Sequence, residues 1–240
     1  MEEALFEPSY RPLRSGAWEL RIVPIAHASG YWGPPRLVCD MAALVRDGST
    51  WMSMTPLEHE SQEIGVRLAF GHVAIFGLGM GWAAAASACR GAVTAVTVVE
   101  KDPDVLALHR DLDIFAQLPP EARGKLRIVE GDAFAWTPEA PIDVLMADIW
   151  LPLVSHGRVE EVRRMQANVR ARAIYFWGQE LEIARHARAA GRPLDEDGIA
   201  ATVADMGLPL LGPSYPGYAG LIEGAARQSM RGRWLEGPAP

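Results

Sequence analysis

Three glycines at alternate positions stand where a buried apolar run meets a tract of alanines. The stretch Val73–Ala86 reads VAIFGLGMGWAAAA, and its glycines are Gly77, Gly79 and Gly81. A residue without a β-carbon permits positive φ and lets the backbone approach a ligand closely. A helix that follows such a turn also offers free N–H groups in its first turn. The pattern predicts a ligand-binding turn, and a glycine-rich turn without a ligand is the alternative.

The spacing of the glycines separates two classes of ligand. A dinucleotide-binding turn has the pattern G-x-G-x-x-G/A, which counted from Gly77 needs a small residue at position 82. Position 82 is Trp82, the bulkiest side chain. The observed G-x-G-x-G therefore favours a nucleoside with an amino-acid tail, S-adenosylmethionine (SAM), over NAD.

Three carboxylates follow the glycine turn at intervals that match the ends of later strands. Glu100 ends TVVE and lies 23 residues after Gly77, close to the spacing of about 20 expected for an acid that binds ribose hydroxyls. A carboxylate accepts two hydrogen bonds at once, which suits two vicinal hydroxyls. Asp132 in VEGDAF could accept from an adenine amino group, and Asp148 in MADIW ends a further strand. The carboxyl ends of parallel strands meet at one sheet edge, so these acids and the turn predict one site.

Alternating strands and helices must position these residues. From Gly71 on, near-continuous Val/Ile/Leu strands alternate with helices, which indicates a parallel sheet covered on both faces. The strands expected are HVAIFGL, Ala92–Glu100, LRIVEGD, Ile142–Ile149 and Arg172–Gly178, and the helices between them are WAAAASACR, PDVLALHRDLDIF and RVEEVRRMQANVRA. The C-terminal part offers a helix in DEDGIAATVADMG and then the Pro/Gly/Tyr-rich GPSYPGYAG.

The N-terminal part differs in pattern. WELRIVPI alternates large apolar and polar residues, and RLVCDMAALV and STWMSM follow as further short strands. The helix expected next is Thr55–Phe70, with Thr55 as N-cap and Pro56 in its first turn. We therefore predict an α/β protein with a doubly wound, mostly parallel, Rossmann-like sheet. Residues 1–54 would form a small β-hairpin subdomain and residues 55–240 the SAM-binding domain.

Together, VAIFGLGMG, TVVEKDPDVLALH, IVEGDAF and IDVLMADIW resemble the class I SAM-dependent methyltransferases, and more closely their spermidine-synthase-like relatives. The resemblance runs from Trp18 to Gly178 and includes ELRIVPI, RLVCDM and the HE of LEHESQE, while PSYPG in the tail looks like a segment of these synthases. It implies SAM as the cofactor, with the tail near the glycines, the ribose on Glu100, the adenine on Asp132 and the sulfonium near Asp148. The cofactor-binding residues expected are Gly77, Leu78, Gly79, Gly81, Glu100, Lys101, Asp132, Ala133 and Asp148.

The segment after the fourth strand departs from that family. Aminopropyltransferases carry D-S-[ST]-D-P there, whereas this chain reads Asp148-Ile149-Trp150-Leu151-Pro152. Leu151 replaces the second acid, and Trp150 makes the pocket more apolar, which suits the charges of a polyamine poorly. The tyrosine that precedes HE in the family is also absent, since Glu58 stands before His59. DIWLP does not match the N/D-P-P-[YF] motif of amine methylation either.

Group transfer from SAM requires the protein to orient the acceptor and remove a proton. Asp148 is the first candidate for the catalytic base and His156 the second, while His59, Gln62 and Trp150 are the candidates for contact with the acceptor. The paired acids and arginines of HGRVEEVRRM are most simply a solvated helix face.

Three functions remain open from these residues. The first is a small-molecule methyltransferase on a spermidine-synthase-like scaffold. The second is an aminopropyltransferase that uses decarboxylated SAM. The third is a protein with a SAM-binding fold that acts in binding or assembly without catalysis, which the loss of the second acid would permit.

The composition limits the classes of molecule that this protein is expected to bind. The net charge is −7 and the basic residues are scattered, which argues against nucleic acid as the main partner. Cys39 and Cys89 form no metal-spaced pair, so no metal site is expected. No apolar run approaches the roughly 20 residues that span a bilayer, and MEEALFEPSYRPLR lacks a signal pattern. We expect a cytoplasmic protein with a small-molecule acceptor and no membrane partner, and the apolar hairpin layer offers a surface for a homodimer.

Overall fold

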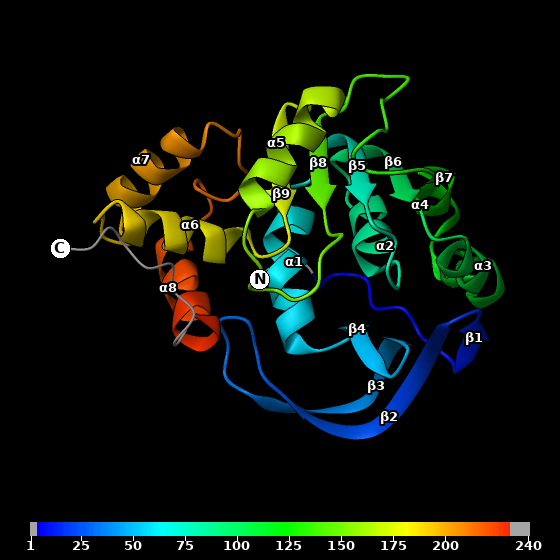
Figure 1. The fold of residues 1–240 in the computed structure, drawn as a ribbon. Coiled ribbons are helices and arrows are strands. Elements are labelled where there is room, and N and C mark those ends of the chain that lie inside the picture. Colours follow the sequence, from blue (N-terminus) through cyan, green and yellow to red (C-terminus); the bar gives the residue numbers. More distant parts are fainter. Residues whose placement is uncertain (1–3, 231–240) are drawn as a thin grey trace.

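The computed structural model describes residues 4–230 and contains two sheets of different kinds. A four-stranded antiparallel sheet comes first in the chain, and a five-stranded parallel sheet follows it. In Figure 1 the antiparallel sheet forms a curved layer in blue beneath the parallel sheet and its helices. This arrangement confirms the predicted α/β class, with a Rossmann-like parallel sheet and an N-terminal hairpin layer.

The antiparallel sheet is built around one long hairpin. Its strands are β1 (Leu13–Ser15), β2 (Trp18–Ala28), β3 (Arg36–Arg46) and β4 (Ser49–Ser53), in that spatial order. β2 and β3 pair along their whole length, from Trp18 opposite Arg46 to Ala28 opposite Arg36. The turn between β3 and β4 places both Asp47 and Gly48 at positive φ, which a tight hairpin turn requires.

The parallel sheet has the order β7-β6-β5-β8-β9. Its strands are β5 (Gly71–Phe76), β6 (Val93–Glu100), β7 (Leu126–Glu130), β8 (Val144–Ala147) and β9 (Ala173–Phe176). β5 is central and pairs with β6 on one side and β8 on the other, so its residues Val73–Phe76 are all buried. The chain turns to β6 after β5 and later returns to β8, which makes the carboxyl end of β5 the switch point where such sheets bind ligands.

Eight helices and one short 3₁₀ helix surround the sheets in the described residues. They are α1 (Pro56–Leu68), α2 (Trp82–Ala88), α3 (Pro103–Leu112), the 3₁₀ helix (Ile114–Gln117), α4 (Pro120–Gly124), α5 (Arg158–Val169), α6 (Gln179–Ala189), α7 (Glu196–Met206) and α8 (Tyr218–Ser229). Side-chain caps explain where three of them begin. Thr55 accepts from the N–H of Glu58, as predicted, and Asp102 and Asp195 likewise cap α3 and α7.

Besides the short α4, two helices were not predicted from the sequence. α6 carries the polar residues Gln179, Glu180, Glu182 and Arg185 on its buried side, so its apolar residues do not form the usual stripe. α8 begins at Tyr218, inside the stretch that looked like a Pro/Gly/Tyr-rich loop. Both lie beyond β9 at the edge of the parallel sheet, where α6 packs on α7 and α8.

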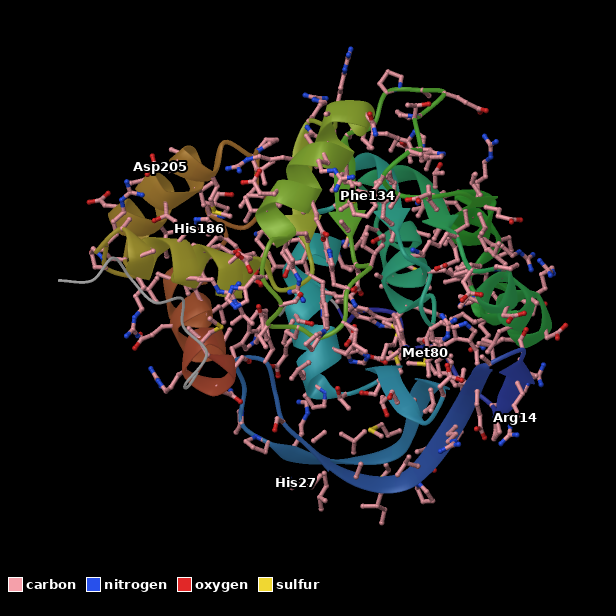
Figure 2. All side chains as sticks on the ribbon, viewed as in Figure 1. Arg14, His27, Met80, Phe134, His186 and Asp205 are labelled. Carbon is pink, nitrogen blue, oxygen red and sulfur yellow. The ribbon has the colours of Figure 1, made fainter. Side chains whose placement is uncertain are left out.

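One continuous core joins the two sheets. Trp18, Leu20 and Leu44 of the antiparallel sheet belong to the same buried cluster as the strands of the parallel sheet. Met80, in the glycine turn, lies between the two sheets (Figure 2), and its N–H points to Sδ of Met52 on β4 at 3.0 Å. The antiparallel sheet is therefore packed over the carboxyl ends of the parallel strands. The domain boundary predicted between residues 54 and 55 stays a prediction.

Candidate active site

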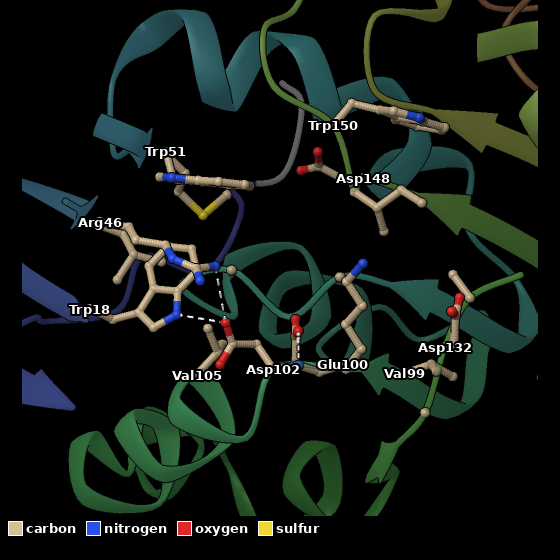
Figure 3. Close-up of a pocket in the computed structure, with 18 of the residues that line it drawn as sticks. Trp18, Arg46, Trp51, Val99, Glu100, Asp102, Val105, Asp132, Asp148 and Trp150 are labelled. Carbon is tan, nitrogen blue, oxygen red and sulfur yellow. Dashed lines mark hydrogen bonds and ion pairs between the residues drawn. The ribbon is translucent and has the colours of Figure 1, made fainter. Parts of the chain in front are cut away.

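A cavity of about 320 Å³ lies at the carboxyl ends of four parallel strands. β5, β6, β7 and β8 each contribute residues at or just beyond their last position, namely Gly77, Glu100, Asp132 and Asp148. In Figure 3, Asp148 lies across the cavity from Glu100. The turn and the three predicted carboxylates are thus brought together at the switch point.

The glycine turn has a conformation that other residues adopt with strain. φ is +93° at Gly77, +50° at Gly79 and +79° at Gly81. A β-carbon on Gly77 would lie 2.1 Å from the main-chain oxygen of Asp148, and one on Gly79 would lie 2.5 Å from Sδ of Met52. Gly77 and Gly79 line the cavity, whereas Gly81 is the N-cap of α2. The turn therefore presents bare backbone to the cavity at two of its three glycines.

His109 supports the turn from outside the cavity. Its Nε2 lies 2.9 Å from the carbonyl oxygen of Gly79, and its Cε1 would be 2.7 Å from a β-carbon on Gly81. Burial lowers the pKa of His109 to about 4, so the ring is neutral near pH 7 and Nε2 carries the proton that it donates. Sequence analysis offers no signal for this contact, because His109 and the turn lie on separate elements.

Glu100 links the turn to the end of β6. One carboxylate oxygen accepts from the N–H of Leu78 at 2.9 Å, and the other accepts from the N–H of Asp102 at 2.8 Å. Each oxygen keeps a further lone pair, so the carboxylate can still accept two hydroxyls. Leu78 itself is buried and takes part through its backbone, while Lys101 lines the cavity with an exposed side chain.

Asp132 and Ala133 follow β7 and form the neighbouring wall. The carboxylate of Asp132 accepts from the N–H of Phe134 at 2.8 Å, which orders the turn after the strand. Asp132 is exposed and Ala133 is buried, and both line the cavity. This end of the cavity can accept a hydrogen bond from a ligand and pack against a flat ring.

Asp148 is joined to a second acid through one amide group. Nε2 of Gln62 donates to Asp148 at 3.0 Å and to Glu58 at 2.7 Å. Gln62 and Glu58 both come from α1, and both are buried. The sequence indicated Gln62 as a contact of the acceptor, but it did not indicate Glu58, which the helix places one turn away on the same face.

Burial controls the charge of this carboxyl pair. It raises the pKa of Asp148 to about 7, although the positive charge of Arg158 works in the opposite direction. Burial also raises the pKa of Glu58 well above its usual range, and the charge of Asp148 adds to that effect. Near pH 7 Asp148 is thus poised between its two protonation states, as a general base requires.

Trp150 stands beside Asp148 and is held by two residues of α5. Its Nε1 donates to the carboxylate of Glu161, and the guanidinium of Arg158 lies 5.4 Å from the centre of its ring. Arg158 is 1% exposed and donates to the carbonyl oxygens of Pro152, Leu153 and Trp177. The interpretation of HGRVEEVRRM as a solvated face was therefore wrong for Arg158, because the main-chain carbonyls of the preceding loop provide its partners.

The antiparallel sheet supplies the remaining wall, which sequence analysis missed. Nε1 of Trp18 donates to Asp102 at 2.8 Å, and Arg46 lies 3.4 Å from the same carboxylate (Figure 3). Trp51, on β4, meets Trp18 edge to face at a centroid distance of 5.2 Å. Trp18, Arg46 and Trp51 line the cavity, and only the packing of one sheet on the other brings them there.

Three other residues considered in the sequence do not line this cavity. His59 stacks on Trp82 at 4.7 Å and borders a separate groove near β3, and burial lowers its pKa to about 4. Trp82 is buried and donates to the carbonyl oxygen of Phe6 at 3.0 Å, so it serves packing. His156 is exposed in the loop before α5. None of the three is placed to meet Asp148 across the cavity.

Residues 4–230 contain neither a metal-ligating cluster nor a helix that could span a membrane. No group of three or more His, Cys, Asp or Glu side chains in this part of the chain could hold a metal ion. Within the same residues, no helix has both the length and the apolar character needed to cross a membrane.

Comparisons with known proteins give partial structural likenesses. No protein-family model and no curated protein matches the chain. The glycopeptide N-methyltransferase MtfA, solved with S-adenosylhomocysteine (SAH), is 26% identical over 46% of this chain and 42% of its own, with a TM-score of 0.36. CalS10, an amino pentose methyltransferase from Micromonospora echinaspora solved with SAM, is 23% identical over 45% and 41%, with a TM-score of 0.31. The 23S rRNA methyltransferase ErmE is 16% identical over 46% and 40%, with a TM-score of 0.34.

These likenesses cover less than half the length of each of the three proteins. All three are methyltransferases, but they act on a glycopeptide, an amino pentose and a ribosomal RNA by their names, and they point to no common acceptor. The TM-scores are low, so the functional argument below rests on the residues of this chain. The spermidine-synthase-like branch has no support from these proteins and stays a prediction.

Proposed function

We propose that this protein is a SAM-dependent methyltransferase of a small-molecule acceptor. One observation carries the proposal: the bare backbone of Gly77 and Gly79 and the carboxylates Glu100, Asp132 and Asp148 line one cavity at the switch point. The cavity has a volume within the range of small-ligand sites, about 300–1,000 Å³. Its residues fit the parts of SAM in the order in which the strands present them.

The roles follow from the donors and acceptors of each residue. Glu100 would accept the ribose hydroxyls with its free lone pairs, and Asp132 with Ala133 would hold the adenine. The main chain at Gly77 and Gly79 would face the amino-acid tail, because both residues line the cavity without a side chain. Asp148 would lie near the sulfonium end, where the acceptor must also arrive.

When bound, SAM would supply a methyl group to a lone pair of the acceptor, and the electron pair of the broken carbon–sulfur bond would stay on sulfur. The protein must hold the two reactants in line, exclude water and take up the acceptor's proton. Asp148 would take that proton, a role supported by its pKa of about 7, which leaves a large carboxylate fraction at neutral pH. Trp51 and Trp150 line the same cavity.

Calorimetric titration with SAM, decarboxylated SAM and NAD tests the proposal. We expect SAM to bind most tightly, and NAD to bind weakly because Trp82 occupies the position of a small residue. Tight binding of NAD would overturn the proposal. Absence of binding by all three would instead favour the non-catalytic role.

A matched pair of variants tests the role of Glu100. Glu100→Gln should weaken SAM binding about tenfold or more, because it removes a charged acceptor of two hydroxyls. Glu130→Gln is the control, since Glu130 ends the adjacent strand β7 opposite Glu100 but lies outside the cavity. Equal affinities of the two variants would remove Glu100 from the site.

A second candidate, an aminopropyltransferase, is favoured by one specific observation. Glu58 stands next to Asp148 through Gln62, so a second acid is present although Leu151 replaces the family's acid in the sequence. Tighter binding of decarboxylated SAM than of SAM would select this candidate over methyl transfer.

A further inference from the structure

Two tryptophans, Trp51 and Trp150, line the side of the cavity that lies opposite Glu100. In Figure 3 they stand on either side of Asp148. In the proposed function, the cofactor contacts Glu100, Asp132 and the glycine turn. The two rings and Asp148 therefore remain for the acceptor, and their chemistry indicates what kind of acceptor fits there.

Trp51 is the extra residue of a β-bulge in the antiparallel sheet. On either side of it, Leu44 pairs with Met52 and Val45 pairs with Thr50. Trp51 itself has no partner on β3. A bulge turns a side chain out of the regular alternation of its strand, and bulges are common beside active sites. Trp51 lines the cavity and is 38% exposed, so a ligand can still cover part of its ring.

Trp150 is held in place by three side chains. Its Nε1 donates to Glu161, and the guanidinium of Arg158 stands over the ring at 5.4 Å from its centre. Phe176 meets the ring edge to face, with the two centroids 6.4 Å apart. Because the indole N–H already has a partner, the ring offers the cavity only apolar surface. An aromatic ring that packs on tryptophan is stabilised beyond the burial of its area, so two such walls favour a flat aromatic acceptor.

The charges at this end of the cavity favour a neutral acceptor. Asp102 is paired with Arg46, and Glu161 accepts the indole N–H described above. Asp148 is then the acid beside the two rings, and the positive charge of Arg158 already acts on it. The sulfonium of the cofactor would bring a second positive charge to the same place. Both positive charges would repel an ammonium group, whereas they leave a neutral molecule unaffected.

The protonation of the buried acids favours a hydroxyl of moderate acidity. Burial raises the pKa of Glu58 well above its usual range, so Glu58 is neutral near pH 7 and adds no negative charge. The pKa of Asp148 is about 7, which is closer to the value of a phenol, about 10, than to that of water, about 15.7. An aliphatic alcohol holds its proton about as tightly as water. The carboxylate of Asp148 therefore suits the removal of a proton from a phenol.

We propose that the acceptor is a neutral aromatic hydroxyl compound, a phenol, whose ring packs against Trp51 and Trp150 and whose hydroxyl meets Asp148. The inference rests on the proposed methyl transfer. Asp148 takes up the hydroxyl proton, a lone pair of the oxygen forms the bond to the methyl carbon, and the electron pair of the carbon–sulfur bond stays on sulfur. The charges balance, because the carboxylate and the sulfonium both become neutral.

Binding of matched compounds to the full chain with SAH tests the acceptor class. The probes are 2-naphthol and its saturated counterpart decahydro-2-naphthol, and putrescine serves as the cationic aliphatic compound. We expect 2-naphthol to bind about tenfold or more tightly than decahydro-2-naphthol, and putrescine to bind weakest. When SAM replaces SAH, mass spectrometry should detect the methyl ether of 2-naphthol. Absence of 2-naphthol binding, equal or tighter binding by either other compound, or binding without formation of the ether would overturn the proposal.

Variants of the two tryptophans test the location. Trp51→Leu and Trp150→Leu should each weaken the binding of 2-naphthol about tenfold, whereas Trp51→Phe keeps an aromatic ring and should bind within about threefold of the wild type. Trp32→Leu is the control, since Trp32 is a half-buried tryptophan in the loop after β2 and lies outside the cavity. Wild-type affinity for 2-naphthol in either leucine variant at position 51 or 150 would overturn the assignment.

The two proposals fail in different ways in this experiment. If wild-type protein binds neither SAM nor SAH, the methyltransferase proposal fails. If it binds SAH but binds 2-naphthol no better than the saturated alcohol, the acceptor inference fails alone. Thermal unfolding of each variant shows whether a loss of binding is a loss of fold. The comparison of the three compounds uses the wild-type protein and does not depend on the variants.

Discussion

Three residues from two other elements determine the hydrogen bonding and the electrostatic surroundings of the Asp148 carboxyl. Gln62 and Glu58 come from α1, and Arg158 comes from α5. Removal from water favours the neutral acid, while Arg158 favours the carboxylate. The balance leaves Asp148 able to take a proton near neutral pH, which an exposed aspartate with a pKa near 3.9 does poorly.

A pH profile tests this property of Asp148. The carboxylate form is the base, and its fraction rises as the pH passes about 7, so the rate of methyl transfer should rise through the same range. Carboxyl ¹³C NMR should give the same midpoint without any acceptor. A midpoint near pH 4 would show that burial does not control the residue.

Substitution at Asp148 complements the profile. Asp148→Asn should lower the rate of methyl transfer about 100-fold or more and remove its dependence on pH near 7, because an amide takes up no proton. Asp197→Asn, exposed at the start of α7, is the control and should match the wild type. An unchanged rate in Asp148→Asn would exclude Asp148 as the base.

At the scale of elements, the turn between β5 and α2 depends on glycine for two reasons. The backbone has positive φ, and the space around it is taken by Asp148, Met52 and His109. The turn is therefore fixed between β8, β4 and α3. A substitution there disturbs the fold and the cavity together.

Gly77→Ala should destabilise the protein by about 2–4 kcal/mol, because the new β-carbon would lie 2.1 Å from a main-chain oxygen that no side-chain rotation can move. Gly91→Ala is the matched control, since nothing lies within 4 Å of its β-carbon position and its φ lies outside the left-handed region. Urea unfolding measures the free energy of unfolding of both variants. Similar stabilities of the two variants would contradict the geometry of the turn.

The loop between β8 and α5 is ordered by the buried side chain of Arg158. The guanidinium donates to Pro152, Leu153 and Trp177, and its planar fork makes several hydrogen bonds at once. Arg158→Lys should therefore cost about 2 kcal/mol of stability and lower the rate of methyl transfer, since Trp150 and Asp148 lose their support. SAM affinity should stay within about twofold. Arg164→Lys, exposed on the same helix, is the control for urea unfolding and for activity, and equal values for both variants would show that the loop does not need the fork.

At the scale of the whole molecule, Glu180 joins distant parts of the chain. Its carboxylate accepts from the phenol groups of Tyr31, Tyr175 and Tyr218, which belong to the loop after β2, to β9 and to α8. The cluster is buried, and burial raises the pKa of Glu180 to about 7 despite the three donors. It thus ties the N-terminal part to the last helix behind the parallel sheet.

This cluster predicts a pH dependence of stability. A carboxyl with a pKa near 4.5 when unfolded and about 7 when folded binds its proton more tightly in the folded state. Its contribution is fully present below about pH 4.5 and is lost as the pH rises through about 7, on the order of 3 kcal/mol in total. Glu180→Gln should remove this part of the pH dependence in urea unfolding between about pH 5 and 8.

Asp148 and Glu58 titrate in the same direction as Glu180, whereas His59 and His109, whose pKa burial lowers to about 4, titrate in the opposite direction, so these groups share the slope that remains in Glu180→Gln. The double variant Glu180→Gln with Asp148→Asn should be flatter still. A wild-type pH dependence in Glu180→Gln would show that the buried carboxyl is not protonated on folding.

The parallel sheet, the glycine turn and the acids at the strand ends could be predicted from the sequence. These features are local, because apolar runs, caps and the missing β-carbons of glycine act within a few residues. Gly77, Glu100, Asp132 and Asp148 are each read from their place on a strand, and the parallel pairing brings them to one edge.

The surroundings of Asp148 could not be predicted from the sequence. Glu58, Arg158, Trp18 and Trp51 come from elements whose position depends on how the antiparallel sheet and the helices pack. Their sequence neighbourhoods look like an ordinary helix face or hairpin, and nothing local distinguishes them. His156 lies close to Asp148 in sequence but is exposed, whereas Glu58 lies 90 residues away and shares an amide with it. Packing brings together residues that are far apart in the sequence and buries them, whereas a sequence pattern describes only residues that are close together in it.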